Sequence, residues 1–424
     1  MIGDSSAPPG RPPTGSIRAD PPATDRPATA AVDAENASGA ATSRDREARM
    51  ILCCISDAGS AVLSDAVGRR GATVLLQEVA EGSSTLRGAD RWRRRLDSLD
   101  IGAVQGRAAA VGARFTVPGD DDWWPGLADL AAVRSTTHGG GVPLGLWVRG
   151  EVSHAPAVAV VGTREATAYG VGVAVEMAAG LAESGVTTVS GAAFGIDAAV
   201  HRGALAAGGR TIAVLACGID VAYPRGHAQL LDRIAGHGQV VAEMPPGATP
   251  TRQGFLTRNR LVAAMSQATV VVEAALRSGA LNTASWAEGL VRVVGAVPGP
   301  ISSPLSAGCH RLIRSGSAVL VTGADEVLQL VGPLGGASVS STQDRPDARA
   351  DLGGTARRVL EALPARGAVG LGRLGAVTGE SPLALLAALG ELGDSGLADR
   401  SDAGWCLSAA DRAATRARSV AGRS

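Results

Sequence analysis

A stretch near residue 250 combines basic, aromatic and amide side chains within nine positions, in the segment TPTRQGFLTRNRLVAAM. These side chains belong to Arg252, Phe255, Arg258, Asn259 and Arg260. A single strand of nucleic acid needs this mixture, because cations track its phosphates while a ring stacks on a base. Asn259 suits a base edge or a backbone cap. Pro and Gly interrupt the stretch, so we expect a loop that runs into a helix. The competing interpretation is a solvated basic loop with Phe255 in the core.

The segment VVGTREATAYG places Gly162, Thr163 and Arg164 after an apolar run. A dinucleotide fingerprint needs G-x-G-x-x-G, whereas the next glycine here is Gly170, which argues against NAD or FAD. We expect a helix to open at this point, with its first amides and the Arg164 guanidinium favouring a phosphate. The alternative is a surface arginine.

A second group of small residues, SGAAFGID, also follows an apolar run and contains Ser190, Gly191, Phe194 and Gly195. Ser190 and Gly191 offer a hydroxyl and an approachable backbone, and Gly195 permits a positive φ. Asp197 is a candidate helix N-cap. His201 lies four residues later, so a metal site or a base relay with Asp197 is the less favoured alternative.

Another predicted helix opens at Ser278 and Gly279, where backbone N–H groups again favour anions. Glu273 ends the preceding apolar run. A carboxylate there either orients the loop or acts as an acid, and we favour orientation.

The elements that must position these residues begin near residue 155, where short apolar runs alternate with helical segments. The runs are AVAVVG, VTTVS, TIAVL, QVVAE, ATVVVE and VRVVGAVPG. Such alternation predicts a parallel sheet covered on both faces, an α/β fold. Ligands of these sheets bind beyond the carboxyl ends of the strands, where the residues above lie.

The remaining chain divides by composition into further segments. We expect a disordered tail over 1–47, a helical domain over 48–118, a sheet domain over 119–331, a linker over 332–353, a three-helix domain with a hairpin over 354–412, and a tail over 413–424. Within the sheet domain, two Trp-rich segments before residue 150 are expected to serve as a connector. The three-helix domain suggests a winged helix. Its third helix carries Glu391 and Asp394 but no Arg, which favours partner contact or packing over duplex DNA.

Composition narrows the function classes. The 424 residues carry 40 basic and 40 acidic side chains, and we find no lysine, so every anion contact must use Arg, backbone N–H groups or hydroxyls. The five cysteines form no CxxC pair, so we expect neither a zinc site nor a disulfide framework. No run of about 18 apolar residues and no signal-peptide pattern is seen, so we expect a cytoplasmic protein without a membrane span.

Six motifs in order resemble the DprA/Smf family of DNA-processing proteins, over about residues 155–320. They are VAVVGTR, SGAAFGID with AAVH and RGAL, TIAVLACGIDVAYP, FLTRNRLVAAMSQATVVVEA, RSGALNTASWA and VPGPISSPLSAGCHRLIRSGS. The resemblance implies an extended Rossmann-like three-layer domain, with variable helical and winged-helix-like domains on either side. It also implies sequence-independent binding of single-stranded DNA, a homodimer and delivery of the DNA to the RecA recombinase, without a cofactor or metal.

By motif position, the resemblance assigns phosphate contacts to Gly162–Arg164, Ser190 and Gly191, base stacking to Phe255, and a basic pocket to Arg252 and 258–260. Two departures stand out. Phe194 occupies a position that is usually basic, and Leu256 replaces a common Pro. Phe194 either stacks on DNA or turns inward and weakens the site.

Two other functions compete with this hypothesis. Related Rossmann-like folds include nucleotide-processing hydrolases with a Gly-rich loop and a Glu, which resemble the surroundings of Glu273. An interaction scaffold acting through the C-terminal domain is the third possibility.

Overall fold

The computed structural model describes residues 43–133, 139–153, 155–332, 352–364, 367–401 and 404–408. The chain divides into two compact units: the first comprises residues up to 153 with 215–222 and 240–258, and the second comprises the rest. The six-segment division expected from the sequence stays a prediction. Its C-terminal tail, most of its linker and residues 1–42 of its N-terminal tail lie outside the described residues.

The first unit contains the predicted N-terminal helices. They are α2 (Ser43–Ile55), α3 (Ala61–Arg70), α4 (Ala72–Glu81), α5 (Ala89–Asp97) and α6 (Ile101–Ala110). Leu52, Leu75 and Trp92 are buried among them, as the helical spacing of apolar residues requires. Ser60 caps α3 by accepting from the Leu63 N–H, at an Oγ–N distance of 3.4 Å.

Nine strands in the described part of the chain form one sheet, in the order β1-β2-β6-β5-β4-β3-β7-β8-β9. Their bounds are β1 (Arg114–Thr116), β2 (Leu146–Gly150), β3 (Ala157–Val161), β4 (Thr187–Ser190), β5 (Thr211–Leu215), β6 (Gln239–Ala242), β7 (Ala268–Val271), β8 (Val293–Ala296) and β9 (Val319–Leu320). The six predicted runs all form strands, and β3 pairs in parallel with both β4 and β7. Part of the expected Trp-rich connector forms strand β2, which pairs antiparallel with β1.

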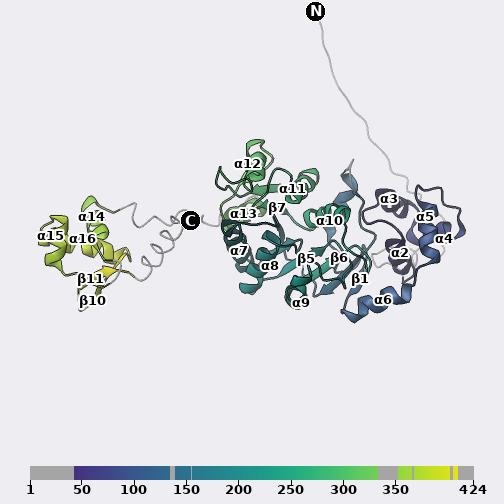
Figure 1. Ribbon diagram of the computed structural model, residues 1–424, viewed down its shortest axis with the longest axis horizontal. Helices are drawn as coiled ribbons and strands as arrows, with labels where there is room; N and C mark the ends of the chain where they lie inside the picture. Colours follow the sequence, from purple (N-terminus) through teal and green to yellow (C-terminus); the bar gives the residue numbers. More distant parts are fainter. Residues whose placement is uncertain are drawn as a thin grey trace, which may run out of the picture. The chain divides into compact units, whose positions relative to one another are not determined.

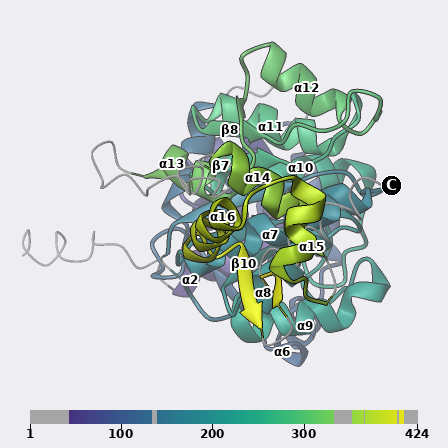
Figure 2. The ribbon, with the colours of Figure 1, turned by 90° about the vertical axis from the view of Figure 1, so that its left-hand side faces the viewer.

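Helices of the second unit cover its strands (Figure 1). They are α7 (Ala168–Glu183), α8 (Ile196–Ala206), α9 (Ala228–His237), α11 (Gly279–Gly289), α12 (Ala307–Arg314) and α13 (Ala324–Val331). Helices α7, α8 and α13 lie on one face, where Met177, Leu181 and Val200 pack against buried strand residues such as Val160 and Val270. Helices α11 and α12 lie on the other side (Figures 1 and 2). This layered α/β architecture confirms the predicted fold class.

The C-terminal segment contains the expected three helices and hairpin. They are α14 (Gly354–Ala362), α15 (Leu371–Thr378), α16 (Pro382–Asp394), β10 (Ala398–Ser401) and β11 (Gly404–Leu407), all labelled in Figure 1. They enclose a small core of their own that includes Val359, Leu374 and Leu389. Ser381 caps α16 by accepting from the Ala384 N–H at 3.3 Å.

Two further properties concern the described residues as a whole. None of their helices combines the length and apolarity that a bilayer crossing requires. Nor do three or more of their His, Cys, Asp and Glu side chains gather in a group that could hold a metal ion.

Candidate functional site

Thr163 joins the loops that follow three parallel strands. Its N–H donates to the Glu273 carbonyl at 2.8 Å, and its own carbonyl accepts from the Ile196 N–H at 3.1 Å. Gly195 adopts a φ of 73°, and a Cβ there would lie 2.4 Å from the Thr163 oxygen. The positive φ predicted for Gly195 is therefore confirmed, and only glycine allows this approach. We call the surface formed by loops 162–166, 191–195 and 274–279 the strand-end ledge.

An aromatic ring and a cation project from the strand-end ledge. Phe194 is 54% exposed, so it does not turn into the core. Its ring meets the His227 imidazole edge to face, with ring centroids 4.7 Å apart. The neighbouring loop exposes Arg164. An exposed ring beside an exposed guanidinium can stack a base and hold a phosphate.

The N-terminus of α7 is filled by Glu273. The sequence predicted a helix opening at Gly162–Arg164, but α7 begins at Ala168 with Thr167 as its N-cap. The Glu273 carboxylate accepts from the Thr167 N–H at 2.9 Å and from the Thr167 hydroxyl at 2.6 Å. A carboxylate at a helix N-terminus takes the place of an external anion. The expected helix start at Gly162–Arg164 is thus wrong, while the phosphate contacts expected of these residues stay a prediction.

Gly170 makes room for that carboxylate. A Cβ on Gly170 would lie 2.2 Å from Glu273 Oε2. Glu273 is only 2% exposed, and both of its oxygens accept hydrogen bonds from Thr167. The favoured interpretation of Glu273 as an orienting residue therefore agrees with the structure.

The segment before α8 differs in detail from the prediction. Gly195, not Asp197, is the N-cap residue, and the Asp197 carboxylate accepts from the Ala193 N–H at 3.3 Å. Asp197 thus closes the turn from inside the helix instead of capping it. His201 is fully buried, with Nδ1 2.7 Å from the Thr211 hydroxyl.

Ser190 and Gly191 lie deeper than a surface contact requires. The Ser190 side chain is fully buried, and its hydroxyl donates to the Val160 carbonyl at 2.8 Å. Gly191 is buried as well. Ser190 therefore links β4 to β3 beneath the strand-end ledge, and Gly191 begins the buried start of loop 191–195.

The basic stretch near residue 250 is helical, not a loop. Helix α10 spans Arg252–Ala264. The Thr251 hydroxyl starts it by accepting from the Gly254 N–H at 3.0 Å. Arg252 is exposed and Phe255 is half-buried, because they lie on the first turn.

The later residues of this stretch are buried by the helix they belong to. Arg258 is 7% exposed and Arg260 is fully buried. Asn259 Nδ2 donates to the Gly279 carbonyl at 3.2 Å and to Asn282 Oδ1 at 3.1 Å. Asn259 thus stabilises the start of α11. Of the two roles considered for Asn259, a base edge or a backbone cap, this contact is the backbone role. The helix expected to open at Ser278 and Gly279 is α11. Ser278 caps it by accepting from the Ala280 N–H, and Gly279 is exposed beside it.

Comparison with known proteins identifies the family. The family model described as DNA recombination-mediator protein A matches residues 116–332, about half of the chain. The chain belongs to the DNA recombination-mediator protein A family. It is 49% identical over 320 residues to a DNA processing protein DprA of Mycobacterium tuberculosis, covering 74% of this chain and 81% of that protein.

More distant members of the DNA recombination-mediator protein A family agree in sequence and fold. Protein Smf of Escherichia coli is 40% identical over 216 residues, covering 50% of this chain and 55% of that protein. The X-ray structure of DNA processing protein A from Streptococcus pneumoniae matches with a TM-score of 0.58 and 30% identity. That match covers 69% of this chain and all of the other. The family and the Rossmann-like fold implied by the sequence motifs are therefore confirmed.

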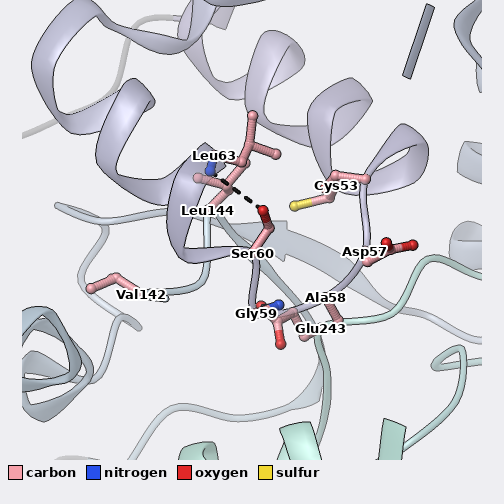
Figure 3. A pocket seen from close by; sticks show the side chains of 10 residues that line it. Cys53, Asp57, Ala58, Gly59, Ser60, Leu63, Val142, Leu144 and Glu243 are labelled. Atoms are coloured by element: carbon pink, nitrogen blue, oxygen red, sulfur yellow. Dashed lines mark hydrogen bonds between the residues drawn. The ribbon is translucent and has the colours of Figure 1, made fainter. Parts of the chain in front are cut away.

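This family member also has a pocket that the sequence analysis missed (Figure 3). It lies open to solvent within the first unit and is lined by Cys53, Ser56, Asp57, Ala58, Gly59, Ser60, Leu63, Val142, Leu144 and Glu243. Glu243 Oε1 accepts from the Gly59 N–H at 3.1 Å. Glu243 directly follows β6, so its place at a strand end was the available signal.

Burial suppresses thiolate formation at most cysteines of this family member. It raises the pKa of Cys53 well above its usual value, with the Glu243 charge adding to the effect. Burial also raises the pKa of Cys54 to about 12, and those of Cys217 and Cys309 to about 11. All are free thiols. These four cysteines therefore suit packing better than nucleophilic chemistry.

Proposed function

We propose that this chain binds single-stranded DNA without strong sequence preference and delivers it to the RecA recombinase. One observation carries the proposal: Thr163 unites three loops into the strand-end ledge, from which Phe194 and Arg164 project. Stacking is tolerant of sequence because every base has a face, and the guanidinium recognises the backbone common to all strands. Membership of a recombination-mediator family supports this use of the surface.

The test is binding of fluorescent oligo-dT of about 20 nucleotides to the full chain, against duplex of the same length. Affinity for the single strand should exceed that for duplex, and it should fall between about 50 mM and about 200 mM salt as counterions are released. Arg164→Glu should weaken binding about tenfold or more. Arg233→Glu, which changes an exposed charge on α9, is the matched control. Undetectable single-strand binding at low salt refutes the proposal.

We also infer that the chain acts without catalysis. A nucleotide hydrolase of this kind would depend on Glu273. That carboxylate is buried, and both of its oxygens accept hydrogen bonds from Thr167. Incubation with nucleoside monophosphates should release no free base. Release that is abolished by Glu273→Gln would establish the hydrolase instead.

Delivery to RecA and assembly as a homodimer are further parts of the proposal, supported by the family's role as recombination mediators. RecA should co-purify with the full chain and assemble faster on oligo-dT in its presence. Sedimentation equilibrium should give twice the chain mass. Deleting residues 354–424 separates a partner role of the C-terminal helices from DNA binding.

A further inference from the structure

The loop after β8 carries an unusually exposed aliphatic side chain. Ile301 is 96% exposed, in the segment PGPISSPLSAG between β8 and α12. Exposure alone assigns no role to such a side chain, because single apolar side chains are common on protein surfaces. The position of this loop beside the strand-end ledge is what gives Ile301 its interest.

This loop is fixed to the strand-end ledge by backbone hydrogen bonds. The Ala274 N–H donates to the Leu305 carbonyl at 2.7 Å, and the Ala274 carbonyl accepts from the Gly308 N–H at 2.7 Å. A Cβ on Gly308 would lie 2.5 Å from that carbonyl oxygen. The loop that bears Ile301 is therefore continuous with loop 274–279.

A second set of contacts holds the loop near its start. The Tyr169 hydroxyl, on the first turn of α7, donates to the Pro298 carbonyl at 2.7 Å. His310 Nε2 on α12 lies 3.0 Å from the Gly299 carbonyl oxygen. Anchored at both ends, the loop presents Ile301 from a defined base.

Parallel pairing sets the order of the exposed side chains. Strands β4, β3, β7 and β8 are successive neighbours, and Val271 pairs with Ala296. Their following loops therefore leave the same edge, about 4.8 Å apart per strand. In that order they expose Phe194, then Arg164, then Leu276 with Arg277, then Ile301. Apolar and basic side chains alternate along about 14 Å of the edge.

We propose that the single strand continues from Phe194 across Leu276 to Ile301, so that the loop after β8 is a further part of the DNA-binding site. Leu276 is 53% exposed, and both aliphatic side chains pack against or between bases, as apolar wedges do elsewhere. Arg164 and Arg277 hold the intervening phosphates. This extension rests on the proposed binding of single-stranded DNA. A protein partner in place of DNA is an outcome that the experiment below distinguishes.

The experiment compares Ile301→Glu with Val291→Glu in the full chain. Val291 is 94% exposed and precedes β8, so the control makes the same charge change at the opposite end of the same strand. Binding of oligo-dT of about 20 nucleotides is measured for each protein. Ile301→Glu should weaken binding of this oligonucleotide about 5- to 10-fold. Val291→Glu should not change it, and Leu276→Glu should resemble Ile301→Glu.

Three outcomes overturn the extension while the proposed function stands. They are wild-type affinity of Ile301→Glu for the oligonucleotide, an equal loss of affinity in Val291→Glu, and loss of RecA co-purification with DNA binding intact. Failure of the wild-type chain to bind any single strand instead defeats the proposed function itself. A photo-crosslinking residue at position 301 gives an independent readout: it should crosslink to the oligonucleotide, and no crosslink at saturating DNA overturns the extension.

Discussion

The Phe194 ring stands against the His227 imidazole, with the two planes at 69°. His227 is itself buried, and its Nδ1 lies 3.0 Å from the Ala192 carbonyl oxygen. Ala192 precedes Phe194 in the same loop, so the imidazole contacts both the backbone and the ring of that loop. The contact with His227 limits the motion of the Phe194 ring and leaves one face of that ring open to a ligand.

Replacing Phe194 with Arg should exchange stacking for charge. We expect affinity for oligo-dT at about 200 mM salt to fall about 5- to 150-fold, because stacking is worth about 1–3 kcal/mol per base. The slope of log affinity against log salt concentration should steepen by about one released counterion. Polarisation titrations across salt measure both. Tighter binding at every salt concentration would show that the position needs a cation and that the ring does not stack.

Two glycines two residues apart on α7 should respond oppositely to alanine. Gly170→Ala should lower the free energy of unfolding by about 1–3 kcal/mol, because its methyl group would displace the Glu273 carboxylate from its hydrogen bonds. Gly172 has nothing within 4 Å of its Cβ position, so Gly172→Ala should stabilise by about 0.5–1 kcal/mol. Urea unfolding measures both. Equal effects would mean that the Gly170 contact with Glu273 is unimportant for stability.

Arginines at the start and middle of α10 should separate binding from stability. Arg252→Glu should weaken single-strand binding by about tenfold or less and leave the melting temperature unchanged, because Arg252 is exposed. Arg258→Gln should lower the free energy of unfolding by about 1 kcal/mol or more, because a buried guanidinium is replaced. Calorimetry and oligo-dT titration are run on both variants. The reverse assignment would contradict the observed burial.

Thiol reactivity should follow burial. At pH 8 a thiol with a pKa of about 11 is about 0.1% thiolate, so Cys217 and Cys309 should react slowly with a disulfide reagent in the native state. Cys53 and Cys54, whose pKa values are also raised, should behave alike. After unfolding in guanidinium, all four thiols should react rapidly with the reagent. Rapid native labelling of any of these four, mapped by peptide mass, would contradict their burial.

An ion pair in the first unit predicts a pH effect. Arg46 donates to both oxygens of Asp120, at 2.6 and 2.7 Å, which lowers the pKa of Asp120. A carboxyl whose pKa falls on folding stabilises above its unfolded pKa of about 3.9, and the contribution is lost as pH falls through the folded pKa. Asp120→Asn should therefore cost about 1 kcal/mol at pH 7 and less below about pH 4. A pH-independent difference in urea unfolding would contradict this.

The strands of the sheet could be predicted because their buried apolar runs are short and end in small residues. Helix caps such as Ser278 and Ser381 also depend on local sequence, because the capping hydroxyl lies within three residues of the N–H that it accepts from. Gly195 was also predictable, because a positive φ is a backbone property of one residue.

One difference from the sequence prediction is local: Gly254 suggested a loop, but the Thr251 hydroxyl caps a helix there. The other differences arose where distant parts of the chain decide the outcome. Arg258 and Arg260 have the composition of a DNA-binding loop, yet the helix turns them inward. The Glu273 contact with Thr167 spans 106 residues, and no local pattern encodes it. Burial and long-range pairing are tertiary properties, so the residue types predicted the chemistry better than its placement.

The carboxylate at the start of α7 also bears on how the DNA leaves. Glu273 already supplies an anion to the N-terminus of α7. DNA bound along the proposed strand-end ledge would therefore be held by several separate contacts instead of one phosphate clamp. A strand held in this way can be peeled off from one end, nucleotide by nucleotide, as a competing filament advances. Each step then crosses a low barrier, whereas a single tight clamp would have to release all at once.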